Sequence, residues 1–442
     1  MYNFINFQIQ QLNNNGIKIL PLKIKKLLLI FFCYFLSLFY LPIFFLIVIV
    51  RKKKFIRFCA IPTARIGHLG FETDILLSNN KLDKNNKNYL NIFTQSIYDT
   101  STEISNKFLL KLFKRKIVFL PTLIVQPFII LATHFKFFEQ HVIKLGEIKK
   151  LPNLIIQTDP IRDINNSIQK TSPNISFTEK EEKKGWDFLE KVFKGNKNNK
   201  FITLIVRDDE YLKKKFVNQN LSYHKYRNCN IENYIEACEK LTELGYYIFR
   251  MGSVSDNKIL SKNSKIIDYA SNGMRTEFLD IFLAAKSEFT ISSGTGWDAV
   301  PYIFRKPILF VSYAPLAQMH TFSNKFMTSF KNHYSNKLKR NLRLSEIFEL
   351  NLANAQDSVN YENKNIELIE NTKLELVDIF LEMENFVKNK LYNKPMKCNY
   401  NYEFFKIFKK YTNYKNELKI LHGEYNARIS SKFLENNQNF TQ

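Results

Sequence analysis

The chain has 442 residues, of which 45% are hydrophobic and 15% aromatic, so it is long enough for two or three domains and too apolar for a disordered protein. Its 65 lysines and arginines outnumber its 41 acidic residues and give a formal charge of +24. Only 13 of these bases are arginines, and the lysines are scattered through Asn-, Ile- and Phe-rich stretches. We therefore expect an anionic membrane or a polyanionic substrate as partner, and no nucleic acid.

The cysteines and histidines do not form a recognisable structural site. The five cysteines contain no CxxC motif, and no zinc-binding spacing occurs among the seven histidines. The sequence therefore favours a reduced, cytosol-facing protein with no metal and no cofactor.

The first predicted element is an apolar segment over residues 27–50, which carries no charge. As a helix of about 36 Å, it exceeds the ~30 Å hydrocarbon core of a bilayer. Bases flank it on both sides: Lys18, Lys23, Lys25 and Lys26 before it, and Arg51, Lys52, Lys53, Lys54 and Arg57 after it. The denser cluster follows the segment and looks like a stop-transfer border, which argues against a cleaved signal peptide. We expect residues 1–54 to anchor the main domain at the cytoplasmic face of the inner membrane.

Two alternatives to a spanning helix stay open for this segment. A kink at Pro42 would turn it into a re-entrant hairpin within one leaflet, and a buried core helix would need no membrane. A second apolar run, residues 117–133, contains two prolines and is predicted to form core strands or an interfacial helix.

Residues 55–190 are predicted to form an N-terminal α/β domain. A strand over 55–62 is followed by a loop over 63–70 and a helix from Phe71, with further strands at 116–121 and 154–158. Arg65 and His68 lie on the loop after the first strand. The polar stretch 162–200 is interpreted as a linker between domains.

Residues 200–340 are predicted to form a second, doubly wound α/β domain, and residues 341–442 a helical C-terminal extension. Strands at 201–207, 246–252, 265–270, 288–296 and 307–315 alternate with helices at 231–245, 276–286 and 297–304. Such alternation predicts parallel βαβ units, in which ligands bind beyond the carboxyl ends of the strands.

A turn of small residues follows the strand at 288–296 and comes directly before a helix: Ser292, Ser293, Gly294, Thr295 and Gly296. Small residues let the backbone approach a ligand closely, and phosphate is the natural guest of such a turn. The turn is neither a P-loop nor a GxGxxG motif. The alternative is a simple turn that caps the helix.

Arginines are expected to complete a diphosphate site beside this turn. Arg207 and Arg250 end two apolar strands, and the guanidinium fork suits a diphosphate. The alternative for each arginine is a pair with a surface carboxylate. We assign donor contacts also to Gly252 and Asp298. Ring and hydroxyl contacts to an acceptor or sugar are assigned to Tyr223, His224 and Arg227, together with Arg65.

The segments RIGHL (65–69), RDDEYL (207–212), YHKYRN (223–228), FLDIFLAAKSEFTISSGTGWDAVP (278–301) and HGEYNARIS (422–430) resemble a family of bacterial glycosyltransferases associated with surface polysaccharide synthesis. More distantly, Val206-Arg207 followed by the small-residue turn is similar to fucosyltransferases that use GDP-fucose. Those enzymes usually have a His-x-Arg motif at this point, where this chain has Ile205-Val206-Arg207.

The resemblance implies a GT-B architecture of two Rossmann-like domains, with the donor in the C-terminal domain and the acceptor near the N-terminal one. It implies that Arg207 grips the donor diphosphate and that Ser293, Gly294 and Thr295 hold phosphate and sugar. We expect metal-independent transfer, with His68 as acceptor base and Asp208 as its substitute.

The expected activity is transfer of a sugar from a nucleotide-sugar donor, with a GDP-sugar favoured, to a growing cell-surface glycan such as lipopolysaccharide or to a lipid-linked acceptor. Two alternatives are a nucleotide-sugar epimerase on the same scaffold and a non-catalytic membrane-bound protein of saccharide assembly.

Overall fold

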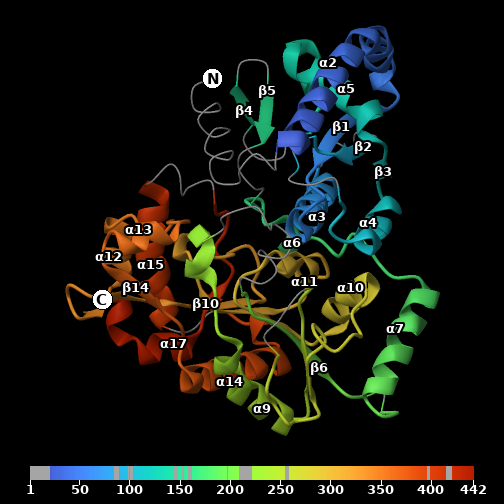
Figure 1. Cartoon of the computed structure of the whole chain (residues 1–442). Coiled ribbons are helices and arrows are strands. Elements are labelled where there is room, and N and C mark those ends of the chain that lie inside the picture. The colour runs from blue at the N-terminus through green and yellow to red at the C-terminus, as the bar shows by residue number, and fades with distance from the viewer. Residues whose placement is uncertain are drawn as a thin grey trace. The chain divides into compact units, whose positions relative to one another are not determined.

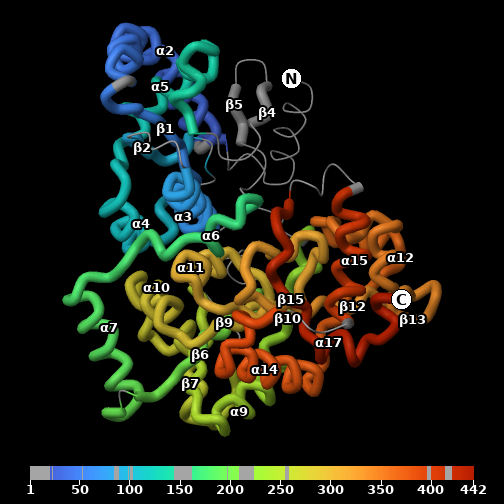
Figure 2. Tube along the Cα trace, turned by 180° about the vertical axis from the view of Figure 1, so that it is seen from behind, coloured from blue at the N-terminus to red at the C-terminus, as the bar shows by residue number. Residues whose placement is uncertain are grey.

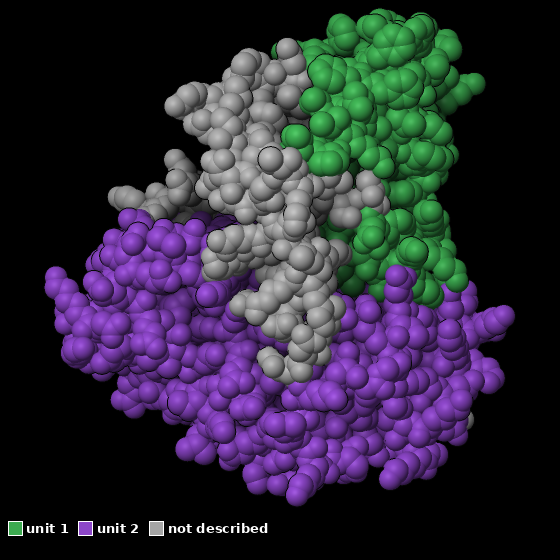
Figure 3. Space-filling model, viewed as in Figure 1, with its two compact units in different colours: residues 1–162, 174–176, 218–220 green, residues 163–173, 177–217, 221–442 purple. Residues whose placement is uncertain are grey.

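The computed structural model describes residues 20–83, 89–97, 99, 103–143, 148–151, 154–157, 162–196, 198–208, 222–253, 258–395, 399–414 and 421–442 (Figure 1). Lys18, Asp209 and Cys398 lie outside them. The chain forms two compact units, coloured separately in Figure 3. Unit 1 comprises Met1–Arg162, Asn174–Ser176 and Asn218–Asn220, and unit 2 comprises Asp163–Pro173, Phe177–Val217 and Leu221–Gln442.

The described part of unit 1 begins with one long apolar helix, α2 (Leu20–Ile49), followed by a short 3-10 helix, η2 (Val50–Lys52). Within α2, Lys23–Ile49 is long and apolar enough to cross a membrane. The prediction of a long apolar N-terminal helix is confirmed. The hairpin at Pro42 is wrong, because α2 continues through this proline without a break.

A three-stranded parallel sheet forms the centre of unit 1, in the order β1-β2-β3. Its strands are β1 (Phe55–Ile61), β2 (Tyr89–Gln95) and β3 (Val118–Phe119). The helices α3 (Ile66–Leu82) and α4 (Lys107–Lys114) connect them, and α5 (Thr122–His134) and η3 (Lys136–His141) follow. The segment 117–133 thus becomes one short strand and one helix.

Two details of unit 1 differ from the prediction. The helix after β1 begins at Ile66 and not at Phe71, because burial of Leu69 and Gly70 against the unit outweighs the low helix propensity of the glycines. The strand β5 (Leu154–Gln157) pairs antiparallel with β4 (Ile148–Leu151) and does not join the parallel sheet.

Unit 2 contains a seven-stranded parallel sheet in the order β15-β11-β10-β9-β6-β7-β8. Its strands are β6 (Phe201–Ile205), β7 (Tyr247–Arg250), β8 (Ile266–Ile267), β9 (Thr290–Ser292), β10 (Ile308–Tyr313), β11 (Phe326–Phe330) and β15 (Arg428–Ile429). Numbered along the chain from β6, this is the order 3-2-1-4-5-6 of doubly wound sheets with a seventh strand added. The predicted α/β class with parallel strands is confirmed.

Helices cover both faces of this sheet (Figure 2). On one face, α9 (Ile235–Glu243) packs against α14 (Lys373–Lys388). On the other face, α10 (Glu277–Lys286) packs against α11 (Ala299–Ile303) and α7 (Glu179–Val192). The helix α7 occupies the stretch interpreted as a linker, and it begins with a capping box of Thr178 and Glu181.

The C-terminal residues belong to unit 2, and their strand β15 extends the large sheet beside β11. A small antiparallel sheet combines β12 (Asn332–Ser335), β13 (Arg340–Asn341) and β14 (Ile366–Ile369). The described residues also form the α-helices α6 (Ser167–Lys170), α12 (Leu344–Glu349), α13 (Ser358–Glu362), α15 (Asn399–Tyr414) and α17 (Ser431–Asn436).

Candidate functional site

The candidate site lies where the direction of strand addition in the large sheet reverses. From β6 the chain proceeds to β7 on one side, whereas β9 starts the half of the sheet on the other side. A doubly wound sheet binds its ligand outside the carboxyl ends of the two strands at this switch point. Arg207 follows β6 there, and Ser293 follows β9.

The ends of β6 and β9 are joined by hydrogen bonds. The Arg207 amide donates to Ser293 Oγ at 2.8 Å, and the Ser293 amide donates to the Ile205 carbonyl at 3.2 Å. The structure therefore brings the strand-end arginine and the small-residue turn together.

Asp298 organises the turn from beneath. Its carboxylate accepts hydrogen bonds from Ser292 Oγ at 2.6 Å, from the Thr295 amide at 2.7 Å and from Thr295 Oγ1 at 3.1 Å. Burial raises the pKa of Asp298 to about 6, although these hydrogen bonds and the charge of Arg227 act in the opposite direction. Asp298 was expected to contact the donor, but this buried carboxylate shapes the turn from inside.

Gly294 occupies a position that requires glycine. Its φ of +87° lies in the left-handed region, and a Cβ atom there would come within 2.9 Å of Tyr313 Cε2. The Gly294 amide donates to Ser292 Oγ at 3.0 Å. These constraints fix the backbone conformation of the turn at Gly294. Gly296, further along the turn, is exposed to solvent.

A second arginine reaches the turn from the 3-10 helix η4 (Ser222–Arg227). Arg227 Nη2 donates to the Gly294 carbonyl at 2.7 Å. Burial raises the pKa of Tyr226, and the positive charges of Arg227 and Arg207 partly oppose this rise, so both guanidinium groups act on the same ring. The two arginines therefore bring positive charge to the switch point.

Lys331 adds a third cation that the sequence did not single out. It directly follows β11, its residue is 3% exposed, and its Nζ donates to the Asn228 carbonyl at 2.5 Å. Burial raises the pKa of the neighbouring Cys229 thiol, and the Lys331 charge opposes that rise. A buried ammonium group beside the turn increases the positive potential there.

Arg250, which is predicted to contact the donor, lies among carboxylates in the structure. Its side chain is 3% exposed and lies 3.0 Å from Asp268 Oδ1 and 3.9 Å from Asp208 Oδ2. Asp268 Oδ2 also accepts hydrogen bonds from Ser271 Oγ and the Ile259 amide. The cluster joins the ends of β6, β7 and β8, which fits the alternative of an arginine paired with carboxylates. Gly252 lies two residues beyond Arg250.

Tyr223 and His224 lie on η4 beside Arg227, with their ring centroids 4.0 Å apart. Ser358 of α13 anchors this helix, because its hydroxyl donates to the Tyr223 carbonyl and accepts from the Tyr226 amide. Tyr223 is 38% exposed, so its ring is accessible to a ligand.

Arg65 and His68 belong to unit 1, whereas the residues described above belong to unit 2. Arg65 is the N-cap of α3, and His68 lies in the first turn of that helix. His68 Nδ1 is 2.6 Å from Glu72 Oε1, and the Glu72 side chain is 1% exposed. A buried carboxylate that holds one ring nitrogen fixes the orientation of an imidazole, as in hydrolase triads.

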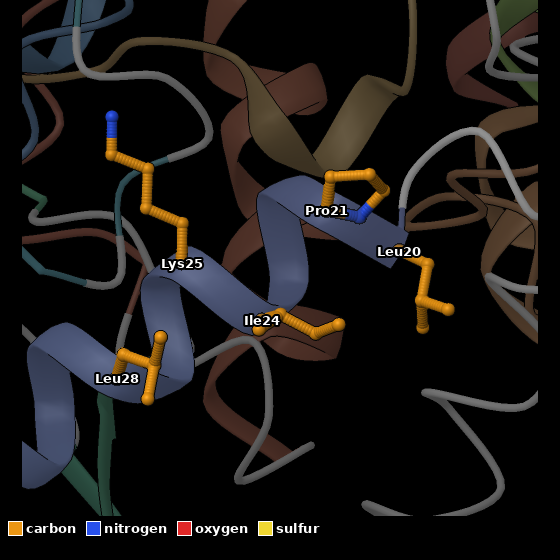
Figure 4. A pocket seen from close by; sticks show the side chains of 5 residues that line it. All are labelled: Leu20, Pro21, Ile24, Lys25 and Leu28. Atoms are coloured by element: carbon orange, nitrogen blue, oxygen red, sulfur yellow. The ribbon is translucent and has the colours of Figure 1, made fainter.

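We also searched the described residues for a metal-binding cluster and for hollows that could hold a ligand. These residues contain no group of three or more His, Cys, Asp or Glu that could hold a metal ion. A hollow of about 480 Å³ lies at the start of α2 and is lined by Leu20, Pro21, Ile24, Lys25 and Leu28 (Figure 4). A second, of about 310 Å³, lies between Lys200, Tyr246 and Glu384. None of the predicted site residues lines either hollow.

Sequence reasoning missed Glu72 and Lys331 for different reasons. Glu72 follows His68 by four residues, which brings the two side chains together only if both lie in one helix. The predicted helix began at Phe71, after His68, whereas α3 begins at Ile66. Lys331 was one of many scattered lysines. In comparisons with known proteins, no family model, no curated protein and no solved structure matches this chain.

Proposed function

We propose that this protein is a membrane-associated glycosyltransferase of GT-B architecture that transfers a sugar from a nucleotide-sugar donor to a cell-surface glycan or its lipid-linked precursor. The observation that carries the proposal is that the Arg207 backbone amide and the Arg227 guanidinium both bond the glycine turn at the switch point of the sheet, and that the charges of both arginines act on Tyr226. The long apolar helix α2 supports the association with a membrane.

The proposed donor site recognises a diphosphate. Guanidinium groups bind phosphate oxygens through paired, charge-assisted hydrogen bonds. Gly294 is buried against Tyr313, whereas Thr295 and Gly296 lie at the accessible side of the turn, where a ligand would meet the backbone. The buried Lys331 adds to the positive potential without reaching solvent.

The reaction follows from this charge. The acceptor oxygen forms a bond to the anomeric carbon of the sugar while the bond from that carbon to the β-phosphate oxygen breaks. The nucleoside diphosphate leaves with the bonding electron pair, and Arg207 and Arg227 stabilise the negative charge that develops on it. The acceptor proton passes to a base, for which we propose His68 with Asp208 as the alternative. The arginines supply the stabilising charge, so transfer needs no metal.

The identity of the donor rests on the resemblance described above. The pair Val206-Arg207 at the end of a buried strand is similar to the strand-end arginine of fucosyltransferases, so a GDP-sugar is the first candidate. The acceptor would be a glycan or lipid-linked saccharide on the cytoplasmic side of the inner membrane.

The test is a thermal-shift screen of the full chain against GDP, UDP, CMP and ADP, followed by transfer assays with sugars of the nucleotide that binds. Arg207→Lys should keep the fold and lower turnover at least about 100-fold, because lysine cannot provide the paired donors. Arg340→Lys is the matched control, since Arg340 on β13 forms an exposed pair with Glu346 of α12.

Unchanged donor binding and turnover in Arg207→Lys would refute the diphosphate site. Isomerisation of the donor without an acceptor would show an epimerase instead, and no reaction with any nucleotide sugar would indicate a non-catalytic protein.

A further inference from the structure

The helix α2 is apolar all around its circumference, yet one face is covered along almost its whole length. At its start, Lys26 Nζ donates to the Asp99 carbonyl at 2.6 Å. In its middle, the Tyr34 ring centroid lies 5.6 Å from that of His134. Near its end, Phe44 stacks on Phe138 with centroids 4.1 Å apart, and Val48 is buried. The covered length from residue 26 to 48 is about 33 Å.

A helix that spans a bilayer cannot keep these contacts. The hydrocarbon core is ~30 Å thick, so a spanning α2 would place most of its covered face, and the groups that pack there, inside lipid. Those groups include the strand β1, through Phe58, and the short helix η3 with its flanking loop, through Phe138. Irregular backbone of this kind does not occur exposed to lipid, because its unpaired groups would have no hydrogen-bond partner.

The opposite face of α2 is exposed and apolar. It includes Phe31, Phe35, Leu38, Phe39 and Leu46, each more than half exposed. Soluble proteins rarely expose a continuous apolar surface of this kind, and such surfaces mark contacts with a membrane or another protein.

This exposed surface continues beyond α2 onto the segment around η3. Phe45 and Phe137 both contact the ring of Phe138, at centroid distances of 5.3 and 5.5 Å. Phe135 and Phe137 are themselves 49% and 55% exposed. We call the exposed side chains of α2 together with Phe135 and Phe137 the apolar face.

Bases border the apolar face at both ends. Lys25 is exposed near the start of α2, Arg51, Lys53 and Lys54 are exposed just after its end, and Lys136 is exposed beside Phe137. A spanning helix usually has most of its bases on one side, whereas a helix in the plane of one leaflet places both ends among headgroups. The balanced distribution suits one anionic surface.

We propose that α2 lies in the plane of an anionic bilayer surface and inserts the apolar face into a single leaflet, so that the protein is monotopic. The proposal rests on the membrane association in the proposed function and is independent of the sugar chemistry. It commits to anionic lipid as the partner because the border of the face is basic.

The first part of the test measures binding of the full chain to phosphatidylcholine vesicles with and without about 30% phosphatidylglycerol, an anionic lipid. We expect stronger binding to the anionic vesicles. Phe137→Asp should weaken binding about 10- to 100-fold although it lies outside α2, because an inserted phenylalanine is replaced by a charge. Leu260→Asp is the control, since Leu260 is 76% exposed in unit 2.

The second part determines topology. Lys25→Cys and Lys53→Cys are labelled separately with a membrane-impermeant maleimide on membrane-bound protein, with the labelling of the unmodified chain subtracted. A monotopic protein exposes both ends of α2 on one side of the membrane. Protection of one end until the membrane is permeabilised would show a spanning helix and overturn this inference alone.

Two further outcomes separate the proposals. Absence of binding to either kind of vesicle would refute membrane association itself, and with it this inference. Equal binding of Phe137→Asp and the unmodified chain, or equal binding to both kinds of vesicle, would overturn the apolar face or its preference for anionic lipid, and would leave the glycosyltransferase proposal standing.

Discussion

The backbone of Gly294 lies so close to the ring of Tyr313 that a Cβ atom at this position would come within 2.9 Å of Tyr313 Cε2. The φ of +87° adds a second constraint, because side chains other than hydrogen are strained there. Gly294→Ala should therefore lower the stability of unit 2 by about 2–3 kcal/mol and displace the turn.

Gly273→Ala is the control for this prediction. Gly273 has a similar φ of +82°, but a Cβ atom there would meet no atom of the other described residues within 4 Å, its two chain neighbours aside. Only the backbone strain of about 1 kcal/mol should then appear. Both tryptophans, Trp186 and Trp297, lie in unit 2, so tryptophan fluorescence during urea unfolding reports this unit. Equal losses in the two variants would show that Tyr313 does not restrict the turn.

The pKa of the Asp298 carboxyl predicts a specific dependence of stability on pH. Burial raises this pKa from 3.8 to about 6, so between these values the folded state binds a proton that the unfolded chain releases. The contribution is fully present below pH 4 and is lost as pH rises through 6, a decrease of about 3 kcal/mol.

Asp280, another buried carboxyl with a pKa raised to about 6, should add a similar decrease. Asp298→Asn cannot titrate and should flatten the decline between pH 4 and 7 by about half. Urea unfolding followed by tryptophan fluorescence at several pH values measures this slope. An unchanged slope in Asp298→Asn would mean that Asp298 is ionised at its ordinary pKa.

Arg250→Gln distinguishes a structural arginine from a donor-binding one. The substitution leaves Asp268 and Asp208 without their buried cation, and removal of one partner of a buried pair costs about 3 kcal/mol or more. We therefore expect a lower unfolding midpoint of unit 2. The KM for the donor, measured at a temperature at which the variant is still folded, should change little.

Arg340→Gln is the surface control for this prediction, because it removes an arginine from an exposed pair and should leave the midpoint unchanged. A large rise in donor KM with unchanged stability in Arg250→Gln would show that Arg250 binds the donor diphosphate.

Much of unit 2 was predictable because its strands are short, mostly apolar and separated by amphipathic segments. Residues 201–205 and 308–313 are buried throughout, as continuous apolar runs in parallel sheets should be. The convergence of Arg207 on Ser293 also follows from pattern alone, since parallel strands end at the same edge.

The features that could not be predicted depend on contacts between residues that are far apart in the sequence. Arg250 and Asp268 pair through the alignment of two strands, which local sequence does not encode. The two-residue strand β15 joins the sheet about 100 residues after β11, with no local signal of its own. The start of α3 was missed because Gly67 and Gly70 favour a loop locally, and packing overrides that preference.

The corrected start of α3 makes Glu72 a positioning residue for His68. The 2.6 Å contact between His68 Nδ1 and Glu72 Oε1 holds one ring nitrogen and so fixes the orientation of the other. We propose that this other nitrogen takes the proton of the acceptor hydroxyl. Under the proposed function, Glu72→Gln should lower kcat about tenfold or more and leave donor KM unchanged, while His68→Gln should lower kcat at least 100-fold.

Steady-state transfer kinetics with saturating acceptor measure both effects, and thermal unfolding checks that unit 1 stays folded. Glu103→Gln, another glutamate of unit 1, serves as the matched substitution outside α3. A merely structural role for Glu72 would lower the unfolding temperature without a selective change in kcat. If His68→Gln retains full kcat, the base is another group, and Asp208→Asn becomes the decisive variant.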